Sequence, residues 1–390
     1  MKSVVRSLKF FALPILFLLC RPLCTPAQHY QQTNLVSDIV GMAPVTDPNL
    51  KNPWGITRSS SSPWWVSNNN SGTSTLYTGA GAIVPINGTG IVTIPPPGFA
   101  PGTQATPTGV VFNGSATDFL LKSGPSAHFI FVTEDGTISA WAGGPKAELE
   151  VDNSDNGSSH GAVYKGATSG EINGKKFLYV TNFRAGRVEV YDTAFKRVHL
   201  GEDAFDADGD CDRDHHGRRD EHDDCDDDRI PSGFAPFNIQ NIGGTLFVTY
   251  AKQDGAKHDD VAGAGLGFVE IFTPRGRHIG HLQHGDWLNS PWGVVWTTRD
   301  FGEFSNAILV GNFGSGWIAA FNGFTYKFEG FLKKPDDSLL TIDGLWSLTF
   351  ANDATAGPAN TLFFSAGING EADGLFGTIT PVDGLDGDEE

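Results

Sequence analysis

Positive charge, cysteine and long apolar runs are all scarce in this chain of 390 residues. It has 27 Lys and Arg against 45 Asp and Glu, which gives a formal net charge of −18. Such a chain would not neutralise a nucleic-acid backbone or an anionic membrane, so neither is expected as a partner. Beyond the N-terminal segment no apolar run approaches the ~20 residues that cross a bilayer, so we expect no membrane span in the mature chain.

The sequence also lacks two short motifs of familiar catalytic chemistry. It has no His-Glu-x-x-His zinc motif and no P-loop. His278, His281 and His284 suggest a three-histidine site, but on a regular strand His281 would point away from the other two. We therefore expect these histidines to be exposed loop and strand residues.

The first 27 residues have the composition of a secretory signal peptide. Lys2, Arg6 and Lys9 precede the apolar run 10–20, and small residues surround an expected cleavage site after Ala27. A retained N-terminal anchor is the alternative. Cleavage would give an exported protein, secreted to the outside of the cell or into a periplasm.

A motif that recurs about every 54 residues predicts the fold. The motif is anchored at Trp54, Thr108, Ala162, Phe237, Trp292 and Trp346. Each copy is followed by alternating apolar and polar residues, a glycine-bearing turn and another alternating run, which is typical of antiparallel strands. Six such units predict an all-β fold, a six-bladed β-propeller in one domain over 28–382. We interpret the recurring tryptophans as packing residues; a stack of β-sandwiches is the rival architecture.

The two ends of the domain are expected to meet. The run 34–40 precedes the first motif and would be left without a partner strand. Pairing it into the last blade beside 376–381 would close the ring and remove two exposed sheet edges. The acidic tail 383–390 is expected to be a solvated extension.

Eight segments resemble a family of uncharacterised exported bacterial proteins. They are 34–38, 46–50, 52–55, 162–166, 235–239, 252–263, 288–293 and 366–376. The family is similar to the NHL-repeat propellers, so the resemblance implies a six-bladed propeller and an exported compartment. It implies no catalytic residues. The long acidic insertion and the lack of a hydrophobic sorting anchor at the C-terminus depart from the family pattern.

The acidic insertion, 202–228, explains the one long spacing between motif anchors. Short acidic side chains alternate within it at Asp206, Asp208, Asp210, Asp212 and Asp214. Such side chains can supply the hard oxygen ligands that Ca²⁺ requires, so we predict a weak calcium site. A solvated loop of mutually repelling charges is the alternative.

The insertion also holds both cysteines of the expected mature chain, Cys211 and Cys225. In an oxidising compartment these two thiols are expected to form one disulfide. A zinc site that combines them with His215, His216 or His222 is the minor alternative.

A polar cluster in the fourth repeat is the best candidate for a ligand site. It contains Lys252, Asp254, His258, Asp259 and Asp260, and His258 beside Asp259 could act as an oriented base. Two further polar turns could face the same rim of the propeller, and they are 68–70 and the turn with Asn369, Glu371 and Asp373. Stabilisation of loops by local hydrogen bonds is the alternative role.

Two classes of function remain open. The first is a secreted, monomeric scaffold that binds a protein, a glycan or a small molecule. The second is a metal-dependent hydrolase or lactonase with a divalent ion in the propeller channel, held by Glu, Asn and Asp. Because the NHL-repeat propellers that the family resembles often serve as binding platforms, the resemblance favours binding, with Ca²⁺ as the one expected metal.

Overall fold

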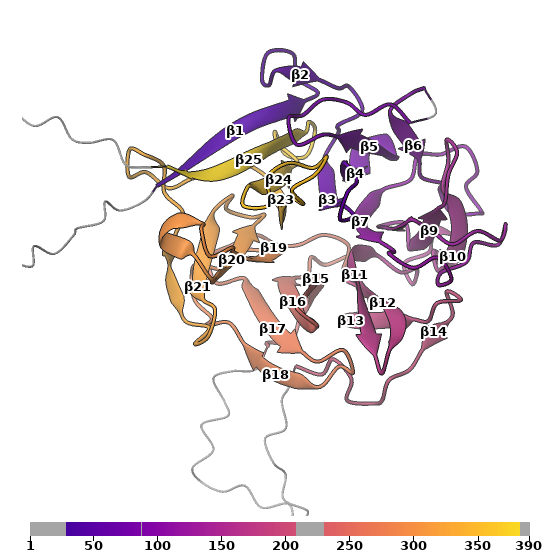
Figure 1. Cartoon of the computed structure of the whole chain (residues 1–390). Helices are drawn as coiled ribbons and strands as arrows, with labels where there is room; N and C mark the ends of the chain where they lie inside the picture. The colour runs from indigo at the N-terminus through magenta and orange to yellow at the C-terminus, as the bar shows by residue number, and fades with distance from the viewer. Residues whose placement is uncertain (1–28, 87, 208–229, 383–390) are drawn as a thin grey trace, which may run out of the picture.

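The computed structural model describes residues 29–86, 88–207 and 230–382. These residues form six sheets around a central axis, antiparallel except where β1 pairs with β2, so the predicted six-bladed propeller is confirmed (Figure 1). The first three blades are β3 (Pro53–Thr57), β4 (Trp64–Asn68), β5 (Thr73–Tyr77) and β6 (Ile91–Thr93); β7 (Pro107–Phe112), β8 (Phe129–Thr133), β9 (Thr137–Trp141) and β10 (Glu148–Asp152); and β11 (Tyr164–Ile172), β12 (Lys175–Asn182), β13 (Arg187–Tyr191) and β14 (Arg197–Val198).

The other three blades follow the same order. They are β15 (Phe234–Ile242), β16 (Thr245–Lys252), β17 (Gly267–Phe272) and β18 (His278–His281); β19 (Pro291–Trp296), β20 (Ala307–Asn312), β21 (Ile318–Asn322) and β22 (Phe328–Phe331); and β23 (Leu345–Phe350), β24 (Leu362–Ala366) and β25 (Leu375–Val382). The sixth sheet also contains β1 (His29–Ser37) and β2 (Val45–Thr46). β1 pairs antiparallel with β25, with Asn34 opposite Gly377, so the last blade combines strands from both ends of the described chain.

The first strand of each blade lies nearest the axis and contacts the first strands of both neighbouring blades. Small residues permit this close approach. A Cβ atom on Gly55 would lie 2.6 Å from the carbonyl oxygen of Thr108, and one on Gly109 would lie 2.7 Å from the backbone nitrogen of Ala167. Each of the six first strands also shifts register where its motif lies, which is typical of a β-bulge.

The structure corrects one motif anchor. In the third blade the register shift falls between Tyr164 and Gly166, so Lys165 lies where the other blades have Trp54, Thr108, Phe237, Trp292 and Trp346. The predicted anchor, Ala162, lies before the strand begins. The anchor was misplaced because the other five blades have an aromatic residue or threonine at this position. The third blade has a lysine there, which the pattern did not lead us to expect.

Aromatic side chains from the first strands, together with Phe313 on the β20–β21 connection, meet at the axis and fill it. Trp54 and Trp346 stack with ring centroids 3.6 Å apart, and Trp292 meets both edge-on at 6.2 and 5.9 Å. Phe313 stacks on Trp346 at 4.0 Å, and Phe237 packs against the same group. We call these five side chains the aromatic plug. The interpretation of the recurring tryptophans as packing residues is confirmed.

The outer strands carry the alternation that the sequence shows. Their apolar side chains form separate clusters between adjacent blades. This is expected for a sheet that buries both of its faces against the neighbouring sheets. In the part of the chain that the structure describes, no helix is long and apolar enough to span a membrane.

Replacement of Trp346 by alanine tests the importance of the aromatic plug. Trp346 is 1% exposed and contacts Trp54, Trp292 and Phe313, so Trp346→Ala should lower the free energy of unfolding by about 3–5 kcal/mol. Urea denaturation followed by tryptophan fluorescence and circular dichroism measures the change. Phe324→Ala is the control, because Phe324 is 82% exposed and its loss should cost no more than about 0.5 kcal/mol. Equal losses in both variants would contradict a special role for the plug.

Candidate functional site

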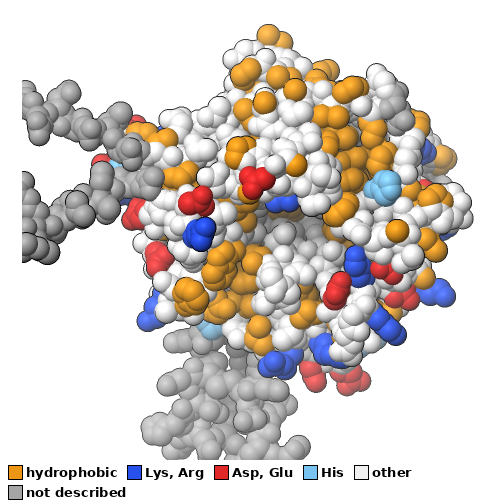
Figure 2. Space-filling model, viewed as in Figure 1, with side chains coloured by type: hydrophobic (Ala, Val, Ile, Leu, Met, Phe, Trp, Pro, Cys, Tyr) orange, Lys and Arg blue, Asp and Glu red, His pale blue; other side chains and the backbone are white. Residues whose placement is uncertain are grey.

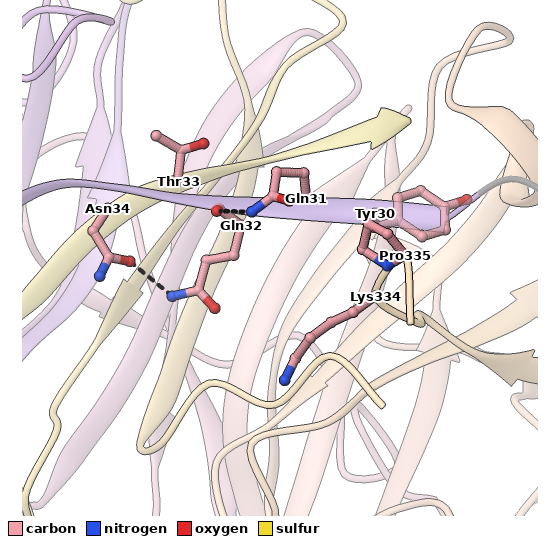
Figure 3. Close-up of a pocket in the computed structure, with 7 residues that line it drawn as sticks. All are labelled: Tyr30, Gln31, Gln32, Thr33, Asn34, Lys334 and Pro335. Carbon is pink, nitrogen blue, oxygen red and sulfur yellow. Dashed lines mark hydrogen bonds between the residues drawn. The ribbon is translucent and has the colours of Figure 1, made fainter. Parts of the chain in front are cut away.

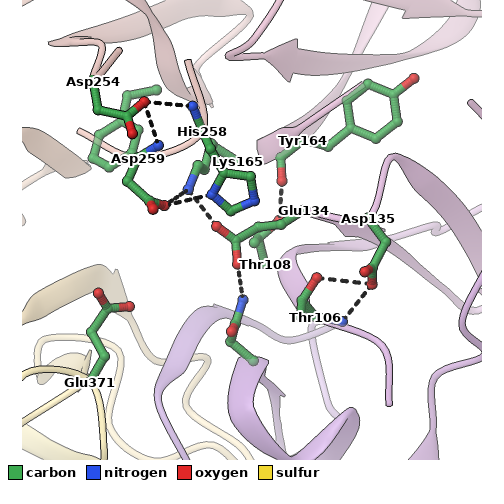
Figure 4. Close-up of polar contacts among 12 residues, drawn as sticks. Thr106, Thr108, Glu134, Asp135, Tyr164, Lys165, Asp254, His258, Asp259 and Glu371 are labelled. Atoms are coloured by element: carbon green, nitrogen blue, oxygen red, sulfur yellow. Dashed lines mark hydrogen bonds and ion pairs between the residues drawn. The ribbon is translucent and has the colours of Figure 1, made fainter. Parts of the chain in front are cut away.

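Polar side chains from several blades converge at one mouth of the channel. They lie on the connections between the second and third strands, such as β8–β9 and β16–β17, and at the starts of the first strands. We call the following residues the mouth cluster: Asn52, Asn69, Glu134, Lys165, His258, Asp259, Asp260 and Glu371. Figure 4 shows most of them, with Glu371 on a separate loop apart from Glu134 and Lys165. Figure 2 shows a propeller face that is hollowed at its centre, with acidic and basic side chains around the hollow.

Lys165 is the centre of this cluster. Its side chain is 2% exposed, and its ammonium forms ion pairs with Glu134 and, at 3.2 Å, with Asp259. It also lies over the rings of Trp54, at 5.1 Å, and Phe183, at 5.8 Å. Burial acts to lower the pKa of Lys165, but the two carboxylates outweigh burial and raise it. Lys165 is therefore a charged lysine fixed at the top of the aromatic plug.

Two asparagines extend the network to other blades. Asn69 Nδ2 donates a hydrogen bond of 2.7 Å to Glu134 Oε2. Asn52 Nδ2 donates to Glu371 Oε2 at 2.7 Å, and Asn52 Oδ1 accepts a hydrogen bond of 3.0 Å from Trp346 Nε1. Through Asn52, the aromatic plug therefore helps to fix the position of Glu371.

His258 and Asp259 form a hydrogen-bonded pair on the β16–β17 connection. His258 Nδ1 lies 2.8 Å from Asp259 Oδ1, and the backbone N–H groups of both residues donate to Asp254 Oδ1, which shapes the turn. The hydrogen bond with Asp259 raises the pKa of His258, and the same bond holds the pKa of Asp259 well below its usual range. The carboxylate orients the imidazole, as the sequence suggested, and directs Nδ1 toward Asp259.

Three other carboxyl groups at the mouth hold their protons more tightly than usual. Burial raises the pKa of Asp260, Glu371 and Asp135. For Glu371 the hydrogen bond from Asn52 opposes this effect, while repulsion from Glu134 and Asp260 adds to it. For Asp135, hydrogen bonds of 2.8 and 2.9 Å from Thr106 oppose it. No hydrogen bond of normal geometry to Asp260 Oδ2 forms within the described residues, although the nearby Ser290 hydroxyl lowers the pKa of Asp260.

The structure separates the predicted ligand-site residues into two groups. The mouth cluster contains four of them: His258, Asp259, Asp260 and Glu371. Asp254 lies next to the cluster and accepts the backbone hydrogen bond from His258 that shapes the turn. The other three predicted residues, Lys252, Asn369 and Asp373, do not join the cluster. Asp373 pairs with Lys51 at 3.1 Å and accepts a hydrogen bond of 2.9 Å from Asn369, while Lys252 is exposed at the end of β16.

Sequence reasoning missed Glu134, Lys165 and Asn52. Glu134 had a usable signal, because it lies in the turn between the second and third strands, the same position in the blade as the polar turns that were singled out. Lys165 was hidden by the misplaced anchor at Ala162. Asn52 lies directly before the first motif and adopts a positive φ of 45°, which the sequence does not reveal.

Glu134, His258 and Asp259 are close enough to hold a metal ion, since one ligand atom from each lies within 4.8 Å of the others. However, Lys165 already forms ion pairs with both carboxylates. A divalent ion at this place would have to compete with a buried ammonium group. The same residues therefore favour a lysine-centred polar network over a metal centre.

Several predictions lie outside the described residues. They are the signal peptide, Cys211 and Cys225 with the zinc ligands proposed beside them, the acidic tail, and the calcium ligands Asp208, Asp210, Asp212 and Asp214. Of the predicted calcium ligands, Asp206 is described, and it is exposed.

A second concave region lies away from the mouth, along β1 on the sixth blade. This groove of about 460 Å³ is lined by Tyr30, the run 31–34, Lys334 and Pro335 (Figure 3). Its polar side chains bond to one another, as in the 2.8 Å hydrogen bond from Gln32 to Asn34. None of the mouth cluster lines it.

Comparison with known proteins identifies relatives of unknown function. The chain is 32% identical over 258 residues to uncharacterized protein R640 of Acanthamoeba polyphaga mimivirus; the match covers 64% of this chain and 44% of R640, so the chain spans less than half the length of that relative. It is 29% identical to uncharacterized protein R648 of the same virus, over 88% of this chain and 78% of R648. No family model matches the chain. These relatives are viral, so the bacterial and exported character that the resemblance implied stays a prediction.

Solved structures with a similar shape include a streptogramin B lyase, with a TM-score of 0.47, 12% identity, and coverage of 91% of this chain and 98% of that one. A glucose dehydrogenase has a TM-score of 0.49 and 11% identity, with coverage of 89% and 98%. A protein of unknown function from Bacteroides thetaiotaomicron has a TM-score of 0.49 and 8% identity, with coverage of 90% and 76%. These similarities do not bear on the chemistry of the mouth cluster.

Removal of the Lys165 ammonium should destabilise the protein. Lys165→Met keeps most of the side-chain volume but leaves Glu134 without its buried cation, so the free energy of unfolding should fall by about 3–5 kcal/mol. The double variant Lys165→Met/Glu134→Gln removes the unpaired charge as well and should recover part of the loss. Chemical denaturation of both variants and of Glu134→Gln completes the double-mutant cycle. Purely additive losses would show that the ion pair does not couple the two residues.

The His258–Asp259 pair should make stability depend on pH. Because the folded-state pKa of His258 is raised, its contribution is fully present below the pKa of the unfolded chain, near 6.5, and is lost as pH rises through the folded-state value. His258→Gln should therefore lower the melting temperature more at about pH 5.5 than at about pH 9. His160→Gln, at an exposed position, should change it little at either pH. An equal decrease for His258→Gln at both values would rule out this linkage.

Proposed function

We propose that this propeller is a binding module, and that the mouth cluster binds a small ligand that carries a positive charge. The observation that carries the proposal is the pair of carboxyl groups at Asp260 and Glu371, which are partly buried and repel each other. The hydrogen bond described for Glu371 comes from a neutral amide, Asn52, and Asp260 Oδ2 accepts none of normal geometry within the described residues. A cationic group between them would favour the ionised form of both.

The charge balance of the mouth supports a cationic ligand. Glu134 and Asp259 are matched by the Lys165 ammonium and by His258, whose raised pKa favours its charged form. Asp260 and Glu371 form none of the described ion pairs, and although the charge of Lys165 lowers the pKa of both, burial outweighs it. Carboxylates that face a concave, partly desolvated site attract a cation more strongly than exposed carboxylates do.

The shape of the channel supports binding from one side. The aromatic plug fills the axis directly beneath Lys165, so a ligand at the mouth meets a closed floor. Beyond the plug, the channel is a narrow cavity lined by uncharged residues of all six first strands. A polar ligand is therefore held at the mouth and does not pass through the ring.

Acid–base catalysis at the same mouth is a second candidate function, and the oriented His258–Asp259 pair favours it. A histidine whose Nδ1 is hydrogen-bonded to a carboxylate can use Nε2 as a general base or acid toward a bound ligand. The earlier alternative, a hydrolase that uses a divalent ion, is less well supported, because Lys165 already forms ion pairs with two of the three candidate ligands.

The remaining features of the proposal come from the sequence. We propose that the protein is exported after cleavage of residues 1–27 and acts as a monomer. In an oxidising compartment Cys211 and Cys225 would form a disulfide within the acidic insertion. The same insertion would bind Ca²⁺ weakly through its aspartates, separately from the mouth.

Titration with two nearly isosteric probes tests the ligand class. N-acetyl-arginine amide carries a guanidinium group, whereas N-acetyl-citrulline amide is neutral at the same position. Calorimetry or ligand-observed NMR should show at least about tenfold tighter binding of the charged probe, and Glu371→Gln or Asp260→Asn should reduce that preference to about threefold or less. Equal affinity for both probes, or binding of neither, would contradict the proposal.

Asp336→Asn is the matched control, because this carboxylate is exposed on the β22–β23 connection and belongs to no mouth contact. It should leave the preference for the charged probe unchanged. Mass spectrometry of the recovered probe distinguishes the two candidate functions. An unaltered probe supports a binding module, whereas a conversion that is lost in His258→Gln supports acid–base catalysis.

A further inference from the structure

Three metal-ligating side chains converge on the two outer strands of the fourth blade. Glu270 lies on β17, and His278 and His281 lie on β18 beside it (Figure 1). One ligand atom from each residue lies within 4.8 Å of the others. The expectation that His281 would point away from His278 is therefore wrong.

A bulge in β18 explains the convergence. Glu270 is opposite His281 and Ile271 is opposite Gly280, but Phe272 is opposite His278, so Ile279 is an extra residue in the ladder. Gly280 adopts φ 151°, a backbone conformation that side-chain-bearing residues seldom reach. Because of the extra residue, two histidines three positions apart share one face of the strand.

His284, the third histidine that the sequence offered, takes no part. Its ring stacks on Phe268 with centroids 4.2 Å apart, and its Nε2 lies 3.0 Å from the carbonyl oxygen of Gly265. His284 therefore contacts the β16–β17 connection. It can serve as a control residue for the two histidines on β18.

The surroundings hold Glu270 in place. Its side chain is 3% exposed, and the residue opposite it on β16, Val248, is fully buried. Glu270 Oε2 lies 2.6 Å from His278 Nε2, and the His278 ring meets Phe272 edge-on at 5.3 Å. No lysine or arginine in the described parts of the chain forms an ion pair with Glu270. The carboxylate of Glu270 is thus held next to two imidazole rings in apolar surroundings. Side chains held in this way can bind a metal ion without rearrangement.

We infer that Glu270, His278 and His281 bind a zinc ion. Two imidazole nitrogens and one carboxylate oxygen form a recurrent three-residue zinc set, with bonds of about 2.0–2.2 Å and a fourth position for water. Ca²⁺ and Mg²⁺ prefer oxygen ligands alone, so the two histidines select against them. Both histidines are partly exposed, so the ion and its water can reach the site from solvent. The inference is independent of the proposed function at the mouth.

Zinc titration of the full chain after chelator treatment tests the inference. Competition with a chromophoric chelator should show zinc binding that His281→Gln weakens by at least about 100-fold, more than the loss expected from a residue outside the ligand set. His284→Gln and His258→Gln are the matched controls and should retain the wild-type affinity. His258→Gln also separates this site from the Glu134–His258–Asp259 group at the mouth.

Melting temperatures and circular dichroism spectra show whether a variant loses zinc binding because it is misfolded. Zinc should raise the melting temperature of the wild-type chain and of both controls but not that of His281→Gln, whose circular dichroism spectrum should match the wild type. His281 lies near the surface at the end of β18, so its replacement is less disruptive than replacement of Glu270. Absence of zinc binding by the wild-type chain, or unchanged affinity in His281→Gln, would overturn the inference.

Discussion

The close approach of six strands around the propeller axis is the constraint on which the rest of the structure depends. The first strands contact one another in a ring, and this is possible because positions such as Gly55 and Gly109 have no side chain between the backbones. The side chains at the anchor positions of these strands then lie near the axis. In four of the six blades, at Trp54, Phe237, Trp292 and Trp346, they are aromatic and pack into the plug. The ring and its closed centre thus follow from one packing requirement.

Lys165 shows what happens when one blade departs from that rule. A lysine at the anchor position is carried to the axis by the same strand geometry, so its charge is buried whether or not a partner is near. An unpaired ammonium at this depth would be costly, and two other blades contribute the compensating carboxylates, Glu134 and Asp259. The mouth cluster is therefore coupled to the fold, because its central ion pairs join the second, third and fourth blades.

The sequence predicted those features that depend on local pattern. Alternation and glycine turns identified the strands, and the recurring motif identified the number of blades. It could not predict features set by a bulge of one residue. The register shift near Tyr164 concealed Lys165, and the extra residue at Ile279 brought together two histidines that a regular strand would separate. Glu371 was singled out, but its proximity to Asp260 arises only when the ring assembles.

The mouth cluster also indicates how the propeller can select a ligand. The Lys165 ammonium forms ion pairs with Glu134 and Asp259 whether or not a ligand is bound, because β11 fixes its position. Asp260 and Glu371 form no ion pair among the described residues. Lys165 lowers the pKa of both without offsetting their burial, and repulsion from Asp260 raises the pKa of Glu371. A neutral ligand would leave that repulsion in place and would also remove water from both carboxyl groups. A ligand with a positive charge would reduce both penalties, so the arrangement discriminates by charge before any finer contact is made.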